Sequence, residues 1–376
     1  MKYIIRLNKS INIVSFDVPY PPNYGGVIDV FYKIKALHNL GIKIFLHTFE
    51  YGRGEQIELN KYCEKVFYYK RQINLIKIFS KIPFIVNTRN EKKLLNNLLN
   101  NNYPILFEGL HTTFPLLTNK FKNRKTIIRN HNVEHNYYTG LARSETNLFK
   151  KLFFRIESKK LKYFEFIFKK TNYILTISPF EQDYFSNSFP LNSIYIPAFH
   201  QNEKVETNEG LGNFALFNGD LRVSDNISAC EFLIDVFSKI SYPLIISSSF
   251  ENNRIQKKII PYKNISFKLI STNDELKFLL QNAHINVLPS FQNTGIKLKL
   301  INALFNGRFC LVNETMAQGT GLKENCIIAN SVIEFRLKIE ELSLLNFSIS
   351  TIEKRKKSLA IFNTQNNAQK IINLLQ

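Results

Sequence analysis

Short apolar runs alternate along this chain with longer segments in which apolar residues recur at helical spacing. The clearest example covers residues 285–313. There, residues 285–289 read as a buried strand, 296–306 as a helix that ends at Gly307, and 309–312 as a second strand. Strands that alternate with helices are typical of a parallel sheet with helices on its faces. The pattern therefore predicts an α/β protein.

The same alternation begins near the N-terminus. Residues 12–17 read as a strand, a proline-rich loop then leads to Gly25 and Gly26, residues 27–39 read as a helix, and 43–48 as the next strand. A strand, a glycine pair and a helix in this order direct backbone amides toward the crevice beyond the strand end, where open α/β sheets bind ligands.

Length and polarity divide the chain into domains. A chain of 376 residues exceeds the size of a single core, and residues 200–213 contain few apolar side chains. We expect an N-terminal Rossmann-like domain over 1–199, a linker over 200–213, a C-terminal Rossmann-like domain over 214–355, and a C-terminal helix over 356–376. We expect the domains to face a central cleft and the C-terminal helices to cross back to the N-terminal domain.

Positive charge is concentrated in one part of the chain. The formal net charge is +20, and residues 119–170 carry 14 Lys or Arg against 4 Glu. Within them, residues 149–170 alternate apolar and basic positions as an amphipathic helix does. Two interpretations stay open: attachment to an anionic membrane surface, and a core-packing helix with a solvated basic face. The chain has no helix-turn-helix, RNP or zinc-finger pattern, so we do not expect a nucleic-acid partner.

Hydropathy and cysteine spacing limit the class of protein. No run of 18 apolar residues appears and the first residues do not resemble a secretory signal, so we expect a cytoplasmic protein. The four cysteines lie far apart without a CxxC pair or a histidine cluster, so we expect buried thiols and not a disulfide framework or a zinc site.

The start of the helix at residue 296 is a candidate anion site. Backbone amides and the positive end of the helix dipole converge there, Gly295 leaves room for a ligand, and Lys297 and Lys299 add positive charge. Cations at this end oppose the dipole unless a negative group binds. The pattern favours a phosphate site, with a solvated helix start carrying surface lysines as the alternative.

Polar side chains also follow two strands of the N-terminal half. Glu108 and His111 come after the strand that begins at residue 104, where the alternatives are a functional cluster and a helix-capping loop. The segment 129–138 (RNHNVEHNYY) follows the next strand. The histidines and Glu134 of this segment do not match the HExxH type of metal site. We therefore favour contacts with an acceptor substrate over a metal.

With both halves considered, the chain resembles GT-B glycosyltransferases, and specifically bacterial members of glycosyltransferase family 4 (group 1). The resemblance covers nearly the whole chain: PPNYGGVIDVFYKIKALHNLGIKI, RNHNVEHNYY, FNGDLRVSDNISACEFLIDVF and INVLPSFQNTGIKLKLINALFNGRFCLVN occur in the family's order. It implies that the domain over 1–199 binds the acceptor and that the domain over 214–355 binds the nucleotide-sugar. It also implies that Gly25 and Gly26 lie near the donor diphosphate, that His111 lines the sugar site, and that the donor base lies near residues 268–270.

Two departures from the family pattern affect the donor site. The family often carries two glutamates eight residues apart, and this chain has Thr294 and Asn302 at those positions. Many members also carry an Arg and a Lys after the first strand of the C-terminal domain, where this chain has Asp220 and Asp225. Asn302 can still bind a ribose hydroxyl, but Thr294 cannot replace a carboxylate. Lys297 and Lys299 are the cations that would replace the missing pair.

The resemblance implies a retaining, metal-independent hexosyltransferase that moves a sugar from a nucleotide diphosphate sugar to a glycan or lipid-linked acceptor, in cell-surface polysaccharide or glycoconjugate synthesis. We expect no cofactor and no metal, and a location in the cytoplasm at the inner face of the plasma membrane. The expected catalytic residues are His111 and Lys297; the donor residues are Gly25, Gly26, Lys268, Ile270, Thr294, Gly295, Ile296, Lys297, Lys299 and Asn302; the acceptor residues are Arg129, His131, Asn132 and Glu134.

Two alternative functions remain. A non-catalytic GT-B subunit or binding protein would explain Thr294 and Asn302, whereas a nucleotide-sugar epimerase would need carboxylates near the sugar ring, for which Glu108 and Glu134 are the candidates.

Overall fold

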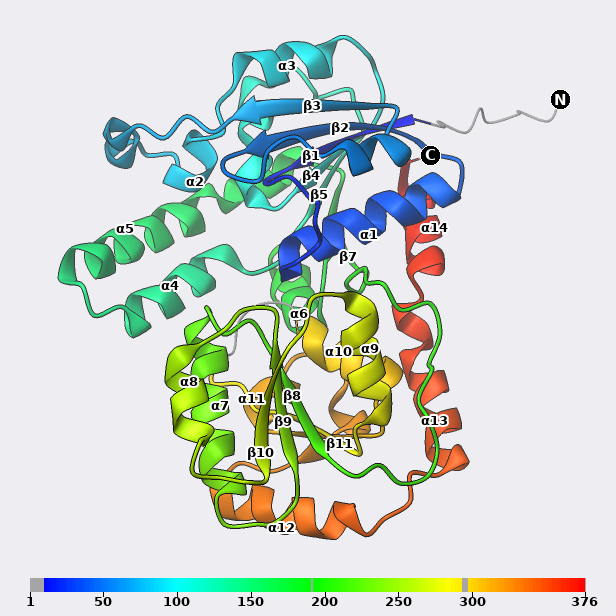
Figure 1. The fold of residues 1–376 in the computed structure, drawn as a ribbon. Coiled ribbons are helices and arrows are strands. Elements are labelled where there is room, and N and C mark those ends of the chain that lie inside the picture. The colour runs from blue at the N-terminus through cyan, green and yellow to red at the C-terminus, as the bar shows by residue number, and fades with distance from the viewer. Residues whose placement is uncertain (1–9, 191, 293–296, 376) are drawn as a thin grey trace, which may run out of the picture. The chain divides into compact units, whose positions relative to one another are not determined.

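The computed structural model describes residues 10–190, 192–292 and 297–375. Thr294, Gly295 and Ile296 lie outside them. The described chain divides into two compact units (Figure 1). Unit 1 comprises the described residues up to 201 together with 364–375, and unit 2 comprises 202–292 and 297–363. Each unit is built around its own parallel sheet.

The sheet of unit 1 has seven parallel strands in the order β3-β2-β1-β4-β5-β6-β7. The strand order reverses where β1 lies between β2 and β4. Such a reversal opens a crevice at the carboxyl ends of the strands, where α/β proteins bind ligands. The strands are β1 (Ser10–Ser15), β2 (Lys43–Glu50), β3 (Lys65–Lys70), β4 (Ile105–Glu108), β5 (Thr126–Arg129), β6 (Tyr173–Thr176) and β7 (Ser193–Tyr195).

Helices cover the sheet of unit 1. One core packs α1 against the sheet and also contains Ala368, Ile371, Ile372 and Leu375 of α14, so the end of the chain completes the core of unit 1. This confirms that the C-terminal segment crosses back to the N-terminal unit. The helices are α1 (Gly25–Asn39), α2 (Phe84–Asn87), α3 (Lys92–Leu99), α4 (Glu134–Ser144), α5 (Leu148–Phe164), α6 (Pro179–Ser188) and α14 (Thr364–Leu375), with short 3-10 helices η1 (Ile57–Lys61), η2 (Leu75–Phe79), η3 (Leu110–Thr112), η4 (Phe114–Thr118) and η5 (Glu165–Lys170).

Unit 2 repeats this design with six parallel strands in the order β10-β9-β8-β11-β12-β13. Its strand order reverses between β8 and β11. The strands are β8 (Ala215–Asn218), β9 (Leu244–Ser248), β10 (Ile265–Leu269), β11 (Ile285–Leu288), β12 (Phe309–Val312) and β13 (Ile327–Ile328); the helices are α7 (Ser224–Phe237), α8 (Asn253–Ile259), α9 (Asn273–Asn282), α10 (Leu298–Asn306), α11 (Glu314–Ala317), α12 (Val332–Ser343) and α13 (Ile349–Leu359), with η6 (Lys323–Asn325) and η7 (Ala360–Phe362).

The two parallel sheets confirm the prediction of an α/β protein with two Rossmann-like domains. The polar stretch after residue 201 lies along unit 2, where the Glu206 amide donates to the Phe305 carbonyl at 2.7 Å and Gly210 pairs with Phe347. None of the described helices combines the length and the apolar character that crossing a membrane requires. The four cysteines are free thiols; Cys63, Cys230 and Cys310 are buried, as expected, whereas Cys326 is only half-buried.

The basic amphipathic segment differs from its prediction in one respect. It is divided into α5 and η5, and the 3-10 turns of η5 bury two consecutive residues, Ile167 and Phe168. The preceding helix, α4, begins at Glu134 inside a polar segment and buries Tyr138 and Ala142. Helical packing against α5 therefore overrides the polar composition that gave no helix signal.

Candidate functional site

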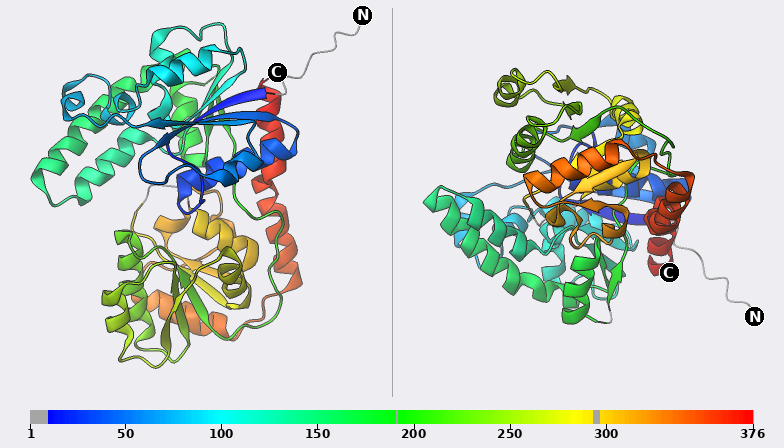
Figure 2. Two further views of the ribbon diagram at one scale, coloured as in Figure 1. Left: turned by 45° about the horizontal axis from the view of Figure 1, so that its top comes forward. Right: turned by 90° about the horizontal axis from the view of Figure 1, so that it is seen from below.

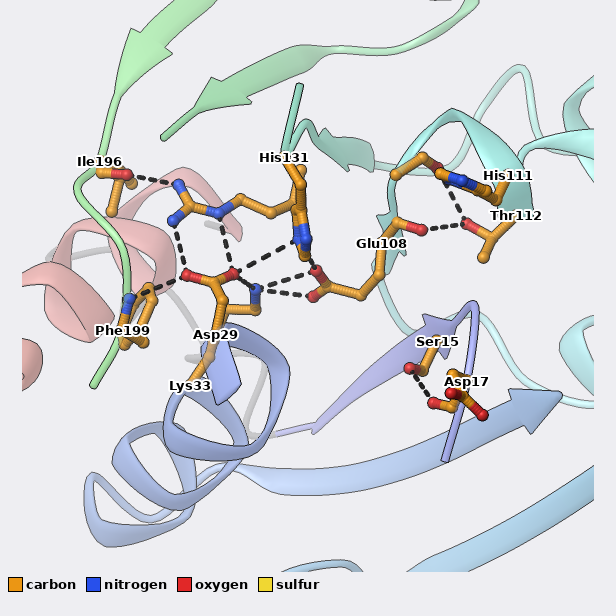
Figure 3. Close-up of polar contacts among 12 residues, drawn as sticks. Ser15, Asp17, Asp29, Lys33, Glu108, His111, Thr112, His131, Ile196 and Phe199 are labelled. Carbon is orange, nitrogen blue, oxygen red and sulfur yellow. Dashed lines mark hydrogen bonds and ion pairs between the residues drawn. The ribbon is translucent and has the colours of Figure 1, made fainter. Parts of the chain in front are cut away.

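Four charged side chains and a histidine meet beneath the carboxyl end of the sheet in unit 1 (Figure 3). Asp29 and Lys33 come from one face of α1, Glu108 ends β4, Arg129 ends β5, and His131 follows β5. The Lys33 ammonium lies 2.8 Å from carboxylate oxygens of both Asp29 and Glu108. The His131 imidazole Nε2 lies 3.1 Å from Glu108 Oε2. All five side chains are buried.

The charges of this cluster compensate one another. Burial alone would raise the pKa of Asp29, but Arg129 and Lys33 outweigh burial, and the pKa of this carboxyl is lowered well below its usual range. Asp29, Glu108 and His131 have ligand atoms within 4.8 Å of one another, as in a metal site. However, the Lys33 ammonium already provides the cation between the two carboxylates, so these residues do not fit a metal ion while Lys33 is charged.

The Arg129 side chain forms hydrogen bonds with other buried groups of unit 1. Its guanidinium donates to Asp29 Oδ1 at 2.9 Å and Oδ2 at 3.2 Å, and also to the carbonyls of Thr176, Ile196 and Pro197. The side chain has no exposed surface. The predicted contact between Arg129 and an acceptor does not fit this burial. Arg129 instead fixes Asp29 and the chain after β7.

A second group of polar side chains lies beside the charged cluster and is incompletely paired. His111 Nδ1 is 4.0 Å from Glu134 Oε1, and neither atom has a hydrogen-bond partner. His131 Nδ1, Asn130 Nδ2 and Asn132 Oδ1 are also buried without a partner. Unsatisfied buried polar atoms are costly, and several in one place indicate a site for a polar ligand.

Local geometry and burial fix the chemistry of His111. Gly109 has φ = 70°, and a Cβ atom there would lie 2.7 Å from His111 Nδ1, so glycine is required for the turn that carries this histidine. Burial lowers the pKa of His111 well below its usual value, with Arg89 and His131 adding to the effect. His111 is therefore a neutral imidazole, which suits hydrogen bonds to sugar hydroxyls better than charge neutralisation.

Glu134 has the opposite shift. Burial raises the pKa of this carboxyl to about 7, against smaller lowering effects of Asn132 and Arg89. A buried carboxyl that titrates near neutrality can accept or donate a proton. Glu134 is the first residue of α4, and its backbone position places it next to His111.

The amino end of α1 borders the same group. The helix begins at Gly25, its N-cap Tyr24 forms no side-chain cap, and its first turn contains no acidic residue. A Cβ atom on Gly26 would lie 2.6 Å from the Phe16 ring and 3.4 Å from His131 Nδ1. The free amides of the first turn therefore open next to an unpartnered histidine nitrogen, an arrangement suited to an anionic or polar ligand.

Unit 2 presents two lysines at the start of α10. Lys297, the N-cap of α10, donates to Gln292 O at 2.6 Å and Ser290 Oγ at 3.3 Å, and Lys299 donates to Asn226 Oδ1 at 3.0 Å. Every one of these acceptors is neutral. Among the described residues, neither ammonium forms an ion pair.

Burial destabilises both ammonium groups. It lowers the pKa of Lys299 to about 8 and also lowers the pKa of Lys297, although the nearby Asp225 carboxylate opposes both shifts. Asp225 does not pair with either lysine; it accepts from the Phe291 amide at 2.7 Å and from Ser290 Oγ at 2.9 Å. Asp225 therefore fixes Ser290 and Phe291, which follow β11.

The other predicted donor residues of unit 2 are spread over the sheet. Asn302 lies on α10 and its Oδ1 accepts from Asn202 Nδ2 at 2.8 Å. Lys268 is exposed on β10, three strands from β11, while Ile270 after β10 is buried. The structure brings Lys297 and Lys299 together at the start of α10 but separates them from Lys268.

The sequence did not indicate Asp29 or Lys33 as site residues, and it indicated Asp225 only as the replacement of a basic donor residue. The first two are spaced by four residues on the apolar face of α1, where opposite charges pair. Two opposite charges on the apolar face of a predicted helix could have indicated a buried ion pair. Nothing in the sequence indicated that Asp225 contacts residues 290 and 291, which lie 65 positions or more away.

No protein-family model matches the chain. A protein of Klebsiella pneumoniae, described as an uncharacterized 44.6 kDa protein in the cps region, is 26% identical over 351 residues, which cover 86% of this chain and 88% of that protein.

Several solved structures share the whole architecture. Sucrose-phosphate synthase from Thermosynechococcus elongatus matches with a TM-score of 0.68 and 15% identity over 97% of this chain and 98% of that one. A variant of S. aureus TarM in complex with fondaparinux, alpha-GlcNAc-glycerol and UDP matches with a TM-score of 0.64 and 13% identity over 98% of this chain and 100% of that one. The lipopolysaccharide outer core galactosyltransferase WaaB matches with a TM-score of 0.63 and 12% identity over 96% and 99%. This chain therefore has the GT-B fold, as the sequence predicted.

Proposed function

We propose that this protein is a glycosyltransferase that moves a hexosyl group from a nucleotide diphosphate sugar to a glycan or lipid-linked acceptor, with retention at the anomeric carbon and without a metal. The observation that carries the proposal is the pair Lys297 and Lys299, whose ammonium groups have only neutral partners at the amino end of α10. Two desolvated cations at a helix start are stabilised by a bound diphosphate.

The reaction breaks the bond between the anomeric carbon and a phosphate oxygen, and forms a bond between that carbon and an acceptor oxygen. Negative charge grows on the departing diphosphate. Lys297, Lys299 and the amides at the start of α10 would stabilise it, because preorganised donors in a buried site lower the barrier most. We assign residues 294–296 to the same phosphate loop, Asn302 to the ribose and residues 268–270 to the base.

In unit 1, the unpartnered polar atoms would bind the sugar and the acceptor. We assign sugar hydroxyls to the neutral imidazole of His111, and acceptor hydroxyls to His131, Asn132 and Glu134. Gly25 and Gly26 would let the donor approach the first amides of α1. Arg129 and Asp29 would hold this group in place from beneath.

The setting of the reaction is also part of the proposal. The K. pneumoniae relative is described by its place in a cps region, which supports synthesis of a cell-surface polysaccharide. TarM was solved with UDP and a sugar-glycerol compound, which supports a nucleotide-linked donor and a glycan acceptor here. We place the reaction in the cytoplasm, at the inner face of the plasma membrane.

Thermal melting with a panel of nucleoside diphosphates, with and without magnesium, tests the donor site. A ligand at 100 times its Kd adds about 2.7 kcal/mol of stability, enough for a shift of a few degrees. We expect a magnesium-independent shift with one base, lost in Lys297→Ala and Lys299→Met but kept in Lys257→Met, an exposed lysine of α8. No shift with any nucleotide would contradict the proposal.

Turnover gives a second readout of the same residues. Lys297→Ala should lower kcat by about a hundredfold or more if Lys297 neutralises the leaving group. Unchanged kcat in that variant would remove Lys297 from the catalytic role.

A non-catalytic binding protein is the second candidate. It is favoured by Asn302, whose side chain is already held by Asn202 within unit 2. Hydrolysis of the bound donor distinguishes the two, because a glycosyltransferase releases sugar to water slowly when no acceptor is present. Nucleotide binding without any release of sugar would support the second candidate.

A further inference from the structure

Helix α5 has three faces of different chemistry. Glu157, Ser158, Leu161 and Phe164 are buried against unit 1. Phe149, Leu152, Ile156 and Tyr163 follow one another at intervals of three, four and seven residues, so they line one side of the helix. All four are exposed, Phe149 to 86% and Tyr163 to 83%. The helix thus carries an apolar stripe that faces away from its own core.

A basic stripe runs beside the apolar one. Lys151, Arg155 and Lys159 are spaced by four residues and therefore share a side of α5. Lys162 lies on the same side but is paired with Glu165 at 3.0 Å. Glu157 is the one acidic residue of α5, and it is fully buried. The outward surface of the helix is thus apolar and positively charged.

The loop around η2 has the same composition. Ile73, Leu75, Ile76 and Phe79 are exposed, Phe79 to 89%, and no residue of η2 is buried. Residues 71–81 contain Arg71, Lys77 and Lys81 and no acidic residue. Such a density of exposed large apolar side chains within one short loop is unusual for a surface in contact with water alone.

Contacts within unit 1 hold this loop against α5. Lys160 Nζ donates to the carbonyl of Ile78. Just after the loop, the ring of Phe84 packs against Phe153 of α5 at 5.9 Å, and its amide donates to Glu157. Helices α4 and α5 form a hairpin that extends away from the sheet of unit 1 (Figure 2). The loop and the exposed side of α5 therefore belong to one part of unit 1.

We propose that the apolar stripe of α5 and the loop 73–79 dock unit 1 onto an anionic lipid bilayer. Together, residues 71–81 and 148–164 carry nine Lys or Arg against the buried Glu157. A bilayer interface with anionic headgroups offers negative charge above an apolar layer, and this pairing matches a basic stripe beside an apolar one. The proposal concerns a surface outside the donor and acceptor residues and stands whether or not the chain transfers a sugar.

The position of this surface agrees with a lipid-linked acceptor. The hairpin begins at Glu134, next to His111, and continues through α4 into α5. Docking through α5 would therefore keep the polar group of unit 1 near the lipid surface. A water-soluble acceptor would not require this proximity.

The absence of tryptophan from the sequence provides a direct test. Phe149→Trp introduces a single tryptophan in the apolar stripe, and Phe278→Trp on α9 places one at an exposed control position. With vesicles of phosphatidylglycerol and phosphatidylcholine, we expect a blue shift of emission for Phe149→Trp and none for Phe278→Trp. An unchanged spectrum at position 149, or equal shifts at both positions, would overturn the proposal.

Charge variants test the basic stripe in the otherwise intact protein. Arg155→Gln with Lys159→Gln removes two positive charges from α5, and Lys354→Gln with Lys357→Gln removes the same charge from the exposed side of α13. Each charge near an anionic surface contributes about fivefold in affinity. We expect the α5 pair to weaken sedimentation with anionic vesicles by roughly 30-fold and the α13 pair by less than about twofold.

Circular dichroism and melting of each variant verify that it folds, as expected for changes at exposed positions. Phosphatidylcholine vesicles alone should bind weakly, and higher salt should weaken binding to the anionic ones. Equal binding to neutral and anionic vesicles, or no binding to either, would overturn the proposal and indicate another partner for this surface. These assays need no donor, so their failure leaves the proposed transferase activity untouched.

Discussion

At the scale of single residues, the site in unit 1 combines two kinds of buried polar group. The cations Lys33 and Arg129 balance the carboxylates of Asp29 and Glu108. His111 and Glu134 lie beside them with unpartnered atoms and shifted pKa values. The second group has buried atoms that would gain a hydrogen bond from a bound polar ligand.

Replacing Lys33 tests the compensated group. Lys33→Met leaves the carboxylates of Asp29 and Glu108 buried without their shared cation, and we expect a loss of about 3 to 5 kcal/mol in the free energy of unfolding. Lys35→Met, on the same helix but partly exposed, should change it by less than about 0.5 kcal/mol. Urea unfolding of both variants measures the difference, and similar values for the two would contradict the assignment.

The pKa of Glu134 predicts a pH dependence of stability. Because the folded-state pKa is raised from 4.5 to about 7, the folded protein binds the proton more tightly than the unfolded chain. The contribution of Glu134 to the free energy of unfolding is fully present below pH 4.5 and is lost as the pH rises through about 7. Glu134→Gln should therefore match the wild type at pH 4.5 and be more stable at pH 8, by at most about 3 kcal/mol.

Urea unfolding at both pH values gives this comparison, with the exposed Glu55→Gln as the control. If Glu134→Gln lost stability at pH 8, or if Glu55→Gln gained as much, burial of the ionised Glu134 carboxylate would not be what destabilises the protein at that pH.

At the scale of elements, two helix starts that carry candidate site residues lack side-chain caps. Helix α1 begins without a side-chain cap beside His131, and α10 begins at Lys297 without one. In contrast, α6 is capped by Ser178 and α9 by Thr272. Uncapped starts leave amides available to a ligand, whereas capped starts use them internally.

Two glycines in helices should respond in opposite ways to alanine. At Gly26 the new Cβ would push the Phe16 ring, which contacts both His111 and His131, so we expect turnover to fall by about tenfold or more with little change in stability. At Gly140 in α4 there is open space, and alanine should raise stability by up to about 1 kcal/mol without affecting turnover.

Steady-state kinetics and thermal melting of the two variants separate these effects. If Gly26→Ala kept full turnover, the start of α1 would not be part of the site.

At the scale of the whole molecule, the C-terminal helix α14 belongs to unit 1, although the residues just before it belong to unit 2. After building unit 2 the chain returns to unit 1, where Ala368, Ile371, Ile372 and Leu375 complete a core with α1 and β2. Unit 1 thus depends on residues from both ends of the sequence. Its stability should be sensitive to changes near the C-terminus.

Ile371→Ala tests this dependence. Removing a fully buried isoleucine side chain should cost about 2 to 5 kcal/mol, and hydrogen exchange should show the loss of protection in α1 and β2 but not in β8 or β11. Ile349→Ala in α13, where the side chain is largely exposed, is the matched control. Equal loss of protection in both units, or none in unit 1, would contradict the assignment of α14 to unit 1.

Most of the architecture could be predicted from the sequence because apolar spacing is a local property. The strands near 43–48 and 285–289 and the helix that ends before Gly307 follow from residues within one or two turns of each other. Helix α4 could not be predicted in this way, since its polar residues become helical by packing against α5.

The candidate chemistry depends on distances that no local pattern contains. The sequence identified Lys297, Lys299, His111 and Glu134 as site residues by type and position after strands. Only the tertiary structure decided that Asp29 and Arg129, 100 positions apart, pair in the interior, and that Asp225 reaches Phe291. The physical reason is that spacing along the chain fixes which face a residue takes, while strand order and helix packing fix which faces meet.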